Sequence, residues 1–517
     1  MKINILGGGP AGLYFAVLMK KRDPAHEIHV VERDGPNDTF GWGIVFSETT
    51  LDNFAQHDRE TYDEFIRAGE MRTQVVVRHK GETICIGGNP IAGVERLKWL
   101  QILHRRCEQL GVRLHFHTNV TNVADYGDCD LLVGADGANS LVRKTYEAFF
   151  LPSIEIRQNK YIWLGTKQTF DGLTMMFKQT EAGLFISHSY RFSPTHSTFI
   201  VECPPETWLK VGFAAMSDEA TCVYLAEVWK EELAGRPLLS NNFVRWLNFP
   251  LIKNRRWHHQ NIVLLGDALH TAHFSIGSGT KLAMEDSIAL AGCFVRRGAS
   301  AVAAALPEFQ RVRKPVVDRF QAAAARSLAW LEEVQEHLHL EPVPFTYRLM
   351  TRSKRVGFKR LQRADPEFAA RYEAWRQAQP QTGPIPSEYL DLFQKKTFAH
   401  LATLMPDGTP HVTSVWIDYD GRRLLVNSAR GRRKDRNMEQ RPNVALEITD
   451  PDNPDRFLAV RGPVVEITEV GADAHLDQLA KRYLDKDFYP PSMRFPGEVR
   501  CLYKIEPRHV TTWNPFG

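Results

Sequence analysis

The feature of this sequence that most restricts its fold is a glycine-rich turn close to the first residue. Residues 7–12 are GGGPAG. An apolar run at 2–6 precedes the turn, a helical pattern at 10–22 follows it, and a second apolar run covers 27–32. Strand, glycine turn, helix and strand at this spacing predict the βαβ unit that opens a doubly wound sheet.

Each glycine of the GxGxxG pattern has a separate task. The first permits the tight turn, the second lets a pyrophosphate approach the backbone, and the third lets the helix pack on the strand. The first turn of the helix offers free N–H groups and partial positive charge to phosphates, and an acid at the end of the second strand can accept hydrogen bonds from a ribose. The predicted dinucleotide-binding residues are Gly7, Gly9, Pro10, Ala11, Gly12, Glu32 and Arg33.

Two later segments repeat the arrangement of a buried strand followed by a glycine and an aspartate. A strand at 131–133 runs into Asp136, and a strand at 262–265 runs into Gly266 and Asp267. A carboxylate at a strand end can bind a ribityl hydroxyl, and a helix amino terminus can stabilise negative charge on a reduced flavin. That second role is predicted for Gly277, Gly279 and Thr280.

Composition limits the remaining possibilities. A chain of 517 residues normally folds as two or more domains. The net charge of +4 gives no reason to expect nucleic acid as a partner. The seven cysteines form no CxxC pair, so we predict no metal site and a reducing compartment. With no signal peptide and no apolar run of about 20 residues, we expect a cytoplasmic protein that does not enter membranes.

Changes of pattern along the chain predict its domains. Strand-like runs at about 154–214 suggest an antiparallel sheet inserted into the first domain, and the helical pattern that follows extends to 375. Residues 376–387 are polar and proline-rich, as expected of a linker. Residues 388–517 contain short strands separated by turn pairs, which indicates a small antiparallel barrel.

The three glycine and aspartate segments, in this order, resemble the FAD-binding pattern of the single-component aromatic hydroxylases, the para-hydroxybenzoate hydroxylase class. In that class the first segment binds the ADP part of FAD, the second lies near the pyrophosphate, and the third holds the ribityl chain. Arg96, in a helical stretch at 94–97, matches an arginine that faces the pyrophosphate. The resemblance implies an α/β fold: a Rossmann-like FAD-binding domain with an inserted antiparallel substrate sheet and a helical segment, followed by an antiparallel split β-barrel.

Longer strings narrow the resemblance to one subgroup over residues 1–370. Residues 41–48, 159–166, 197–203 and 270–281 are similar to those of salicylyl-CoA 5-hydroxylase, 2-aminobenzoyl-CoA monooxygenase/reductase and the violacein hydroxylase. This implies that NADH or NADPH reduces FAD and that O2 supplies an oxygen atom to an aromatic ring, free or carried as an aryl-CoA thioester. Candidate catalytic residues on or near the inserted sheet, one of which would act as a general base, are His188, His196, Tyr161 and Glu48.

The C-terminal region carries a basic loop. Residues 431–437 place four positive charges within five residues, between a strand and a helical stretch, where a phosphate could bind. The region resembles the pyridoxamine-phosphate-oxidase-like split barrels, especially the branch that uses the deazaflavin coenzyme F-420; other branches bind FMN. Lys434 and Asn437 match the phosphate-side positions of that branch. Such barrels usually dimerise, so the resemblance implies a homodimer.

The sequence therefore predicts an FAD-dependent monooxygenase fused to a reductase that uses deazaflavin or FMN. Two alternatives stay open. The chain could be a flavin reductase that consumes no O2, or the barrel could act only as a cofactor carrier or as the reductase of the FAD.

Overall fold

The computed structural model describes residues 1–241, 245–277, 279–297, 302–378 and 384–514. Its contacts divide the chain into two compact units, Met1–Tyr372 and Glu373–Gly517. Part of the expected linker at 376–387 lies outside the described residues. Each unit has its own hydrophobic core.

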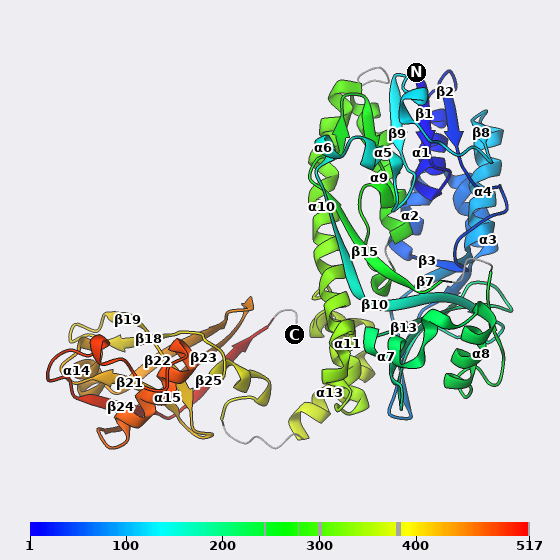
Figure 1. Cartoon of the computed structure of the whole chain (residues 1–517). Helices are drawn as coiled ribbons and strands as arrows, with labels where there is room; N and C mark the ends of the chain where they lie inside the picture. The colour runs from blue at the N-terminus through cyan, green and yellow to red at the C-terminus, as the bar shows by residue number, and fades with distance from the viewer. Residues whose placement is uncertain (242–244, 278, 298–301, 379–383, 515–517) are drawn as a thin grey trace. The chain divides into compact units, whose positions relative to one another are not determined.

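The first unit is built on a six-stranded sheet in the order β16-β17-β9-β1-β2-β8, parallel except for β16 (Figure 1). Helix α1 follows β1 through the glycine turn and contacts α4 and α9. The bounds are β1 (Lys2–Leu6), α1 (Pro10–Arg22), β2 (Glu27–Val31), α4 (Arg96–Gln109), β8 (Arg113–His115), β9 (Leu131–Gly134), β16 (His258–His259), β17 (Ile262–Leu264) and α9 (Gly279–Arg297).

Neighbouring parallel strands bring the three sequence segments together. Leu6 pairs with Gly134, and Gly134 pairs with Leu264, so β1, β9 and β17 end at one edge of the sheet. Because ligands of open α/β sheets bind outside the carboxyl ends of the strands, the glycine turn and the two aspartate segments converge where a dinucleotide is expected.

A second sheet of eight strands lies below the first in Figure 1, in the order β14-β10-β13-β12-β11-β5-β6, with β15 on β10. It is wider than the expected insertion at 154–214, because it recruits strands from both sides of that range. The bounds are β5 (Val75–His79), β6 (Glu82–Ile86), β10 (Pro152–Thr166), β11 (Leu173–Thr180), β12 (Gly183–Arg191), β13 (Ser197–Cys203), β14 (Leu238–Leu239) and β15 (Leu247–Asn254).

The two faces of this sheet differ in chemistry. Alternate residues such as Ile162, Phe199 and Val201 pack in an apolar cluster with α8 (Asp218–Val228) and its neighbour α7 (Pro205–Val211). Side chains alternate between faces along a strand. Tyr161 and Glu202, paired directly across β10 and β13, therefore share the opposite face, which is polar and aromatic.

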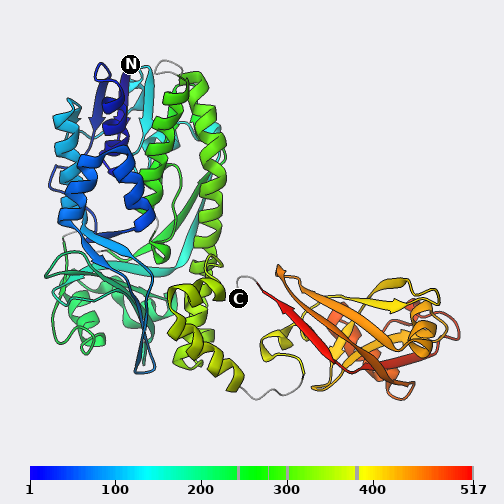
Figure 2. The same cartoon turned by 180° about the vertical axis from the view of Figure 1, so that it is seen from behind.

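The remaining elements of the first unit are a three-stranded sheet, β3-β7-β4, and the helices (Figure 2). None of the helices in the described part of the chain is long and apolar enough to cross a membrane. The bounds are β3 (Gly43–Ser47), α2 (Glu48–His57), α3 (Arg59–Ala68), β4 (Glu70–Arg72), β7 (Ile91–Glu95), α5 (Leu141–Thr145), α6 (Glu147–Phe150), α10 (Val302–Glu332), α11 (Pro342–Thr351), α12 (Phe358–Ala364) and α13 (Pro366–Ala378).

The second unit is an antiparallel sheet in the order β19-β18-β22-β23-β24-β21-β20, with β25 on β23. Strands β19 and β20 lie at the two ends of this path but are separated in the chain only by Trp416. The sheet must therefore curl round on itself, as in a split barrel. The bounds are β18 (Ala399–Leu404), β19 (Pro410–Val415), β20 (Ile417–Tyr419), β21 (Leu424–Ala429), α14 (Arg433–Gln440), β22 (Asn443–Asp450), β23 (Asn453–Thr468), α15 (Ala472–Leu484), β24 (Arg500–Ile505) and β25 (His509–Trp513).

Candidate active site

The glycine turn has the geometry that a bound pyrophosphate needs. Gly7 has φ +110°, and a Cβ there would lie 2.2 Å from the carbonyl oxygen of Ala135. A Cβ on Gly12 would lie 2.4 Å from the carbonyl oxygen of Gly7, whereas one on Gly9 would meet nothing within 4 Å. Gly7 and Gly12 thus allow backbone segments to touch, and Gly9 leaves open space for a ligand over the start of α1.

The carboxylate of Glu32 is fixed beside this turn. It accepts hydrogen bonds from the backbone N–H groups of Gly8, at 2.7 Å, and of Asp34, at 3.0 Å. Arg33 is exposed and pairs with Asp34 at 3.3 Å. Each carboxylate oxygen has a second lone pair, so Glu32 retains acceptor capacity for a ribose hydroxyl.

Asp136 serves both the fold and the predicted ligand. Its Oδ2 accepts from the N–H groups of Leu141, at 2.6 Å, and Val142, at 3.1 Å, at the start of α5. Its Oδ1 is buried and has no hydrogen-bond partner among the described residues. Buried polar atoms normally find a partner, so this orphaned acceptor fits a site that takes a donor from a ligand.

Arg96 and Asp267 form an opposed pair of charges inside the unit. The expected helical stretch at 94–97 was wrong in its first half: Val94 and Glu95 end β7, and Arg96 is the first residue of α4. Its Nε donates to Thr39 Oγ1 at 3.1 Å. Burial raises the pKa of Asp267 and Arg96 opposes that rise, yet the Asp267 side chain keeps exposed surface. Protein therefore surrounds this carboxylate without covering it, as a ligand site requires.

The turn before α9 completes the predicted FAD site. Gly277 has φ +59° and approaches the side chain of Val45. Gly279 and Thr280 form the start of α9, so their N–H groups are free of helix partners. Ser278, between Gly277 and Gly279, lies outside the described residues.

A buried histidine and carboxylate pair lies on the polar face of the second sheet. His188 Nε2 is 3.2 Å from Glu202 Oε2, and the Asn159 side chain donates to Glu202 Oε1 at 2.8 Å. Burial acts to raise the pKa of Glu202, but His188, together with His273 and Asn159, outweighs it, so the pKa is lowered. Glu202 is thus an ionised acceptor. It was not among the predicted site residues, although an acid inside an apolar strand was a visible signal.

Aromatic side chains surround this pair. Tyr161 stands opposite Glu202 in the ladder, and its ring centroid is 4.9 Å from that of Phe274. Phe274 is 5.3 Å from His188 and nearly perpendicular to it. Burial raises the pKa of Tyr161, and Asp267 adds to the rise. This electrostatic coupling to Asp267 shows that the sheet face lies towards the predicted flavin site.

Two further residues join the cluster, His273 next to Phe274 and Arg352 from a distant part of the chain. Burial lowers the pKa of His273 to about 3, so its imidazole is neutral. Arg352 donates from Nη2 to the Ser275 carbonyl at 2.8 Å and from Nε to Ser327 Oγ at 2.8 Å. It therefore fixes the turn that carries Phe274. Sequence patterns gave no sign that Arg352 reaches this turn.

The other two predicted catalytic residues lie elsewhere. His196 is in the hairpin between β12 and β13, where its Nδ1 is 2.9 Å from Thr195 Oγ1. Glu48 is the first residue of α2 and has an exposed side chain. Within the described residues neither is hydrogen-bonded to the His188–Glu202 pair.

In the second unit the basic loop leads into α14, as expected. Lys434 lies near Arg432 and Arg500, and burial together with these two cations lowers its pKa to about 8. Asn437 is buried and donates to Thr403 Oγ1 at 3.0 Å, which ties α14 to β18. Lys434 is therefore suited to an anion, whereas the amide of Asn437 already supports the fold.

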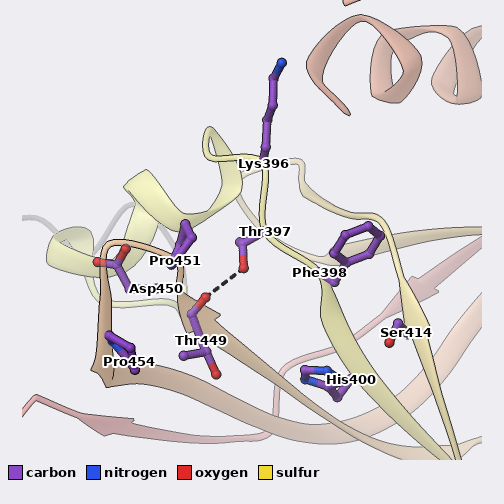
Figure 3. Close-up of a pocket in the computed structure, with 9 residues that line it drawn as sticks. All are labelled: Lys396, Thr397, Phe398, His400, Ser414, Thr449, Asp450, Pro451 and Pro454. Atoms are coloured by element: carbon purple, nitrogen blue, oxygen red, sulfur yellow. Dashed lines mark hydrogen bonds between the residues drawn. The ribbon is translucent and has the colours of Figure 1, made fainter. Parts of the chain in front are cut away.

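A pocket of about 480 Å³ opens at another side of this unit (Figure 3). It lies between the start of β18, the end of β19 and the turn between β22 and β23. Among the residues that line it, the Thr397 hydroxyl donates to the Thr449 carbonyl at 2.7 Å. Its lining residues are Lys396, Thr397, Phe398, His400, Ser414, Thr449, Asp450, Pro451 and Pro454.

The two-sheet architecture of the first unit and its convergent glycine, aspartate and arginine residues define an FAD-dependent aromatic monooxygenase. The chain belongs to this family: the FAD binding domain model matches residues 1–324. The pyridoxamine 5'-phosphate oxidase model matches residues 385–514 and accounts for the second unit.

Curated relatives agree with this assignment. The chain is 38% identical to a salicyloyl-CoA 5-hydroxylase of Streptomyces, over 75% of this chain and 76% of the relative. It is 34% identical to the protodeoxyviolaceinate monooxygenase of Chromobacterium violaceum, over 68% of this chain and 95% of the relative.

Solved structures share the fold of the first unit. A 2-methyl-3-hydroxypyridine-5-carboxylic acid oxygenase matches with a TM-score of 0.54 at 17% identity, over 70% of this chain and 97% of the other. PqsL of Pseudomonas aeruginosa, in complex with 2-aminobenzoylacetate, matches with a TM-score of 0.52 at 19% identity, over 66% of this chain and 98% of the other.

Proposed function

We propose that this enzyme hydroxylates an aromatic ring carried on a CoA thioester or a carboxylate, with NADH or NADPH as the electron donor. The observation that carries the proposal is the buried His188–Glu202 pair, which faces the Phe274 turn from the aromatic side of the second sheet. A salicyloyl-CoA hydroxylase among the relatives supports the choice of substrate class.

The role proposed for His188 follows from the state of Glu202. An ionised carboxylate only accepts hydrogen bonds, so His188 Nε2 carries the proton of the contact at 3.2 Å. In the neutral form of this imidazole Nδ1 holds a lone pair and can take the proton of a phenol. Removing that proton makes the ring electron-rich at the carbon to be oxygenated. Glu202 orients the imidazole, and Asn159 orients Glu202.

The chemistry of the residues proposed to hold FAD suits the group. Open space at Gly9, the orphaned Asp136 oxygen, and the accessible Asp267 carboxylate beside Arg96 lie at one sheet edge. Bound FAD would supply the redox chemistry that activates O2. The chain's part is to keep the ring site dry, for which the rings of Tyr161 and Phe274 are placed.

For the second unit we propose a reductase function with the deazaflavin coenzyme F-420 or FMN, whose phosphate Lys434 would hold from the first turn of α14, with Asn437 three residues further along the helix. A homodimer and a cytoplasmic location also belong to this proposal. The match to the pyridoxamine 5'-phosphate oxidase model supports the unit's capacity for a flavin-like cofactor.

The test combines cofactor analysis with isotope labelling. We expect purified protein to release FAD, and NADH or NADPH oxidation to rise when an aryl-CoA or aromatic acid is added. Product formed under labelled O2 should contain one labelled oxygen atom. Turnover without label would instead favour a reductase that consumes no O2. Turnover of the reduced deazaflavin without aromatic substrate would favour a barrel that reduces the FAD.

A further inference from the structure

The segment that runs from the end of α11 through α12 carries an unusual excess of positive charge. Residues 351–364 contain six basic residues and no acidic residue. Its second residue, Arg352, donates to the Ser275 carbonyl and so anchors the Phe274 turn. The segment continues through α12, and the side chains of Arg355, Lys359, Arg360 and Arg363 are exposed.

A charge run is usually only a solvated helix face, but this one is gathered into a cluster by tertiary contacts. The Arg355 guanidinium lies 4.1 Å from the ring centroid of Phe320 on α10, and Lys281 Nζ from α9 lies 5.2 Å from the same ring. Burial lowers the pKa of Arg355, and the neighbouring Arg360 lowers it further. Lys281 from α9, Arg355 from the loop between α11 and α12, and Arg360 from α12 therefore lie close together.

Among the described residues, the acids near this cluster are too few to neutralise it. Glu285 lies 3.5 Å from Lys281 but also 3.0 Å from Arg313, so one carboxylate is shared by two cations. Asp365, just after the segment, accepts hydrogen bonds from the backbone N–H groups of Gly87 and Phe368 instead. The net positive charge is left for an external anion.

The position of the cluster indicates which anion. Lys281 follows the Gly277–Gly279 turn by two residues, and Arg352 contacts the turn that carries the ring-lining Phe274. An anion bound at the cluster would thus be linked to a group held at the ring site. Arginine binds phosphate through paired N–H donors and stays charged at all working pH values.

We propose that Lys281, Arg355, Arg360 and Arg363 form a binding strip for the phosphates of the CoA that carries the aromatic acyl group. The strip rests on the proposed hydroxylase function and specifies the thioester, rather than the free acid, as the substrate. The pantetheine arm would run from the strip past Arg352 to the ring site.

The test uses the full-length, FAD-loaded protein and a triple variant, Arg355→Gln with Arg360→Gln and Arg363→Gln. Calorimetry with free CoA, in the absence of turnover, should show binding about tenfold weaker than in the unchanged protein, since charged phosphate contacts are lost. Dephospho-CoA should bind the unchanged protein more weakly than CoA. The KM for NADH or NADPH should not move.

A matched control removes the same charge elsewhere in the unit: Arg67→Gln with Arg113→Gln and Arg311→Gln, all exposed arginines. We expect its affinity for CoA to equal that of the unchanged protein. Equal CoA affinity in the triple variant and the control would overturn the strip. A triple variant in which only the KM for NADH or NADPH rises would also contradict the strip. The same holds if the unchanged protein binds no CoA and accepts acyl groups only from a carrier protein.

The two proposals fail separately. Equal turnover of a free aromatic acid and its CoA thioester would refute the strip and leave the hydroxylase standing. Weaker CoA binding in the triple variant, with no labelled oxygen in any product, would support the strip and refute the hydroxylase.

Discussion

The candidate active site of the first unit and the basic loop of the second hold their charges in opposite ways. In the first, the charged groups have partners in the fold: Glu202 accepts hydrogen bonds from His188 and Asn159, and Asp267 lies near Arg96. In the second, Lys434 is partly buried beside two other cations. Buried polar groups that are hydrogen-bonded within the fold need no ligand. Arg432 and Arg500 each pair with Glu498, so among the described residues Lys434 is the cation of these three that an anion would partner. The first arrangement suits catalysis on an aromatic ring, and the second suits capture of a phosphate.

The largest effect should come from breaking the pairing in the first unit. Glu202→Leu would leave the buried donors of His188 and Asn159 without an acceptor. We expect the free energy of unfolding of this unit to fall by about 2–4 kcal/mol, measured by urea titration with tryptophan fluorescence. Glu227→Leu, an exposed position on α8, should change it by less than about 0.5 kcal/mol. An equal loss of unfolding free energy in both variants would contradict a stabilising role for the contacts of Glu202.

Removing the base should affect turnover more than folding. We expect His188→Asn to lower kcat for hydroxylation about a hundredfold, because the phenol proton loses its acceptor. FAD content should remain normal, which is measured from the absorbance of released cofactor. His196→Asn, in the hairpin, should lose less than about tenfold. A larger loss of kcat in His196→Asn than in His188→Asn would indicate that the base lies in the hairpin.

A glycine in each unit allows a further comparison, Gly12 in the first and Gly431 in the second. Gly12→Ala would place a Cβ 2.4 Å from the Gly7 carbonyl oxygen, so we expect overpacking to cost about 1–3 kcal/mol and to reduce FAD content. Gly431→Ala in the basic loop meets no atom within 4 Å and strains only a backbone at φ +77°. It should leave FAD content unchanged. Retention of full FAD content by Gly12→Ala would contradict close helix and strand packing at this turn.

The smallest expected effect concerns pH in the second unit. With the pKa of Lys434 near 8, its charge is present below that pH and is lost as pH rises through it. Affinity for FMN or F-420 should therefore fall several-fold between about pH 7 and about pH 9.5, followed by fluorescence titration. Lys434→Arg should remove this dependence, since arginine stays protonated. An unchanged profile in the variant would exclude Lys434 as the responsible cation.

Much of the fold was predictable because its signals are local. The strand at 2–6, the helix at 10–22 and the turn between them appear at the expected bounds. Arg96 lies in a helix as expected, but Val94 and Glu95 continue a strand, and a strand-to-helix junction leaves little pattern in four residues. The second sheet was underestimated because β5, β6 and β15 are distant in sequence from its centre.

The sequence alone determined the glycine turn, the order of the three cofactor segments and the change to a second, strand-rich unit, since each depends on backbone preferences within a few residues. Only the tertiary structure decided that Glu202 faces His188, that Arg352 holds the Phe274 turn, and that Lys281 and Arg355 meet at Phe320. Such contacts depend on strand register and helix packing across the whole unit. A slip of one residue in the pairing of β13 would turn Glu202 to the opposite face of the sheet.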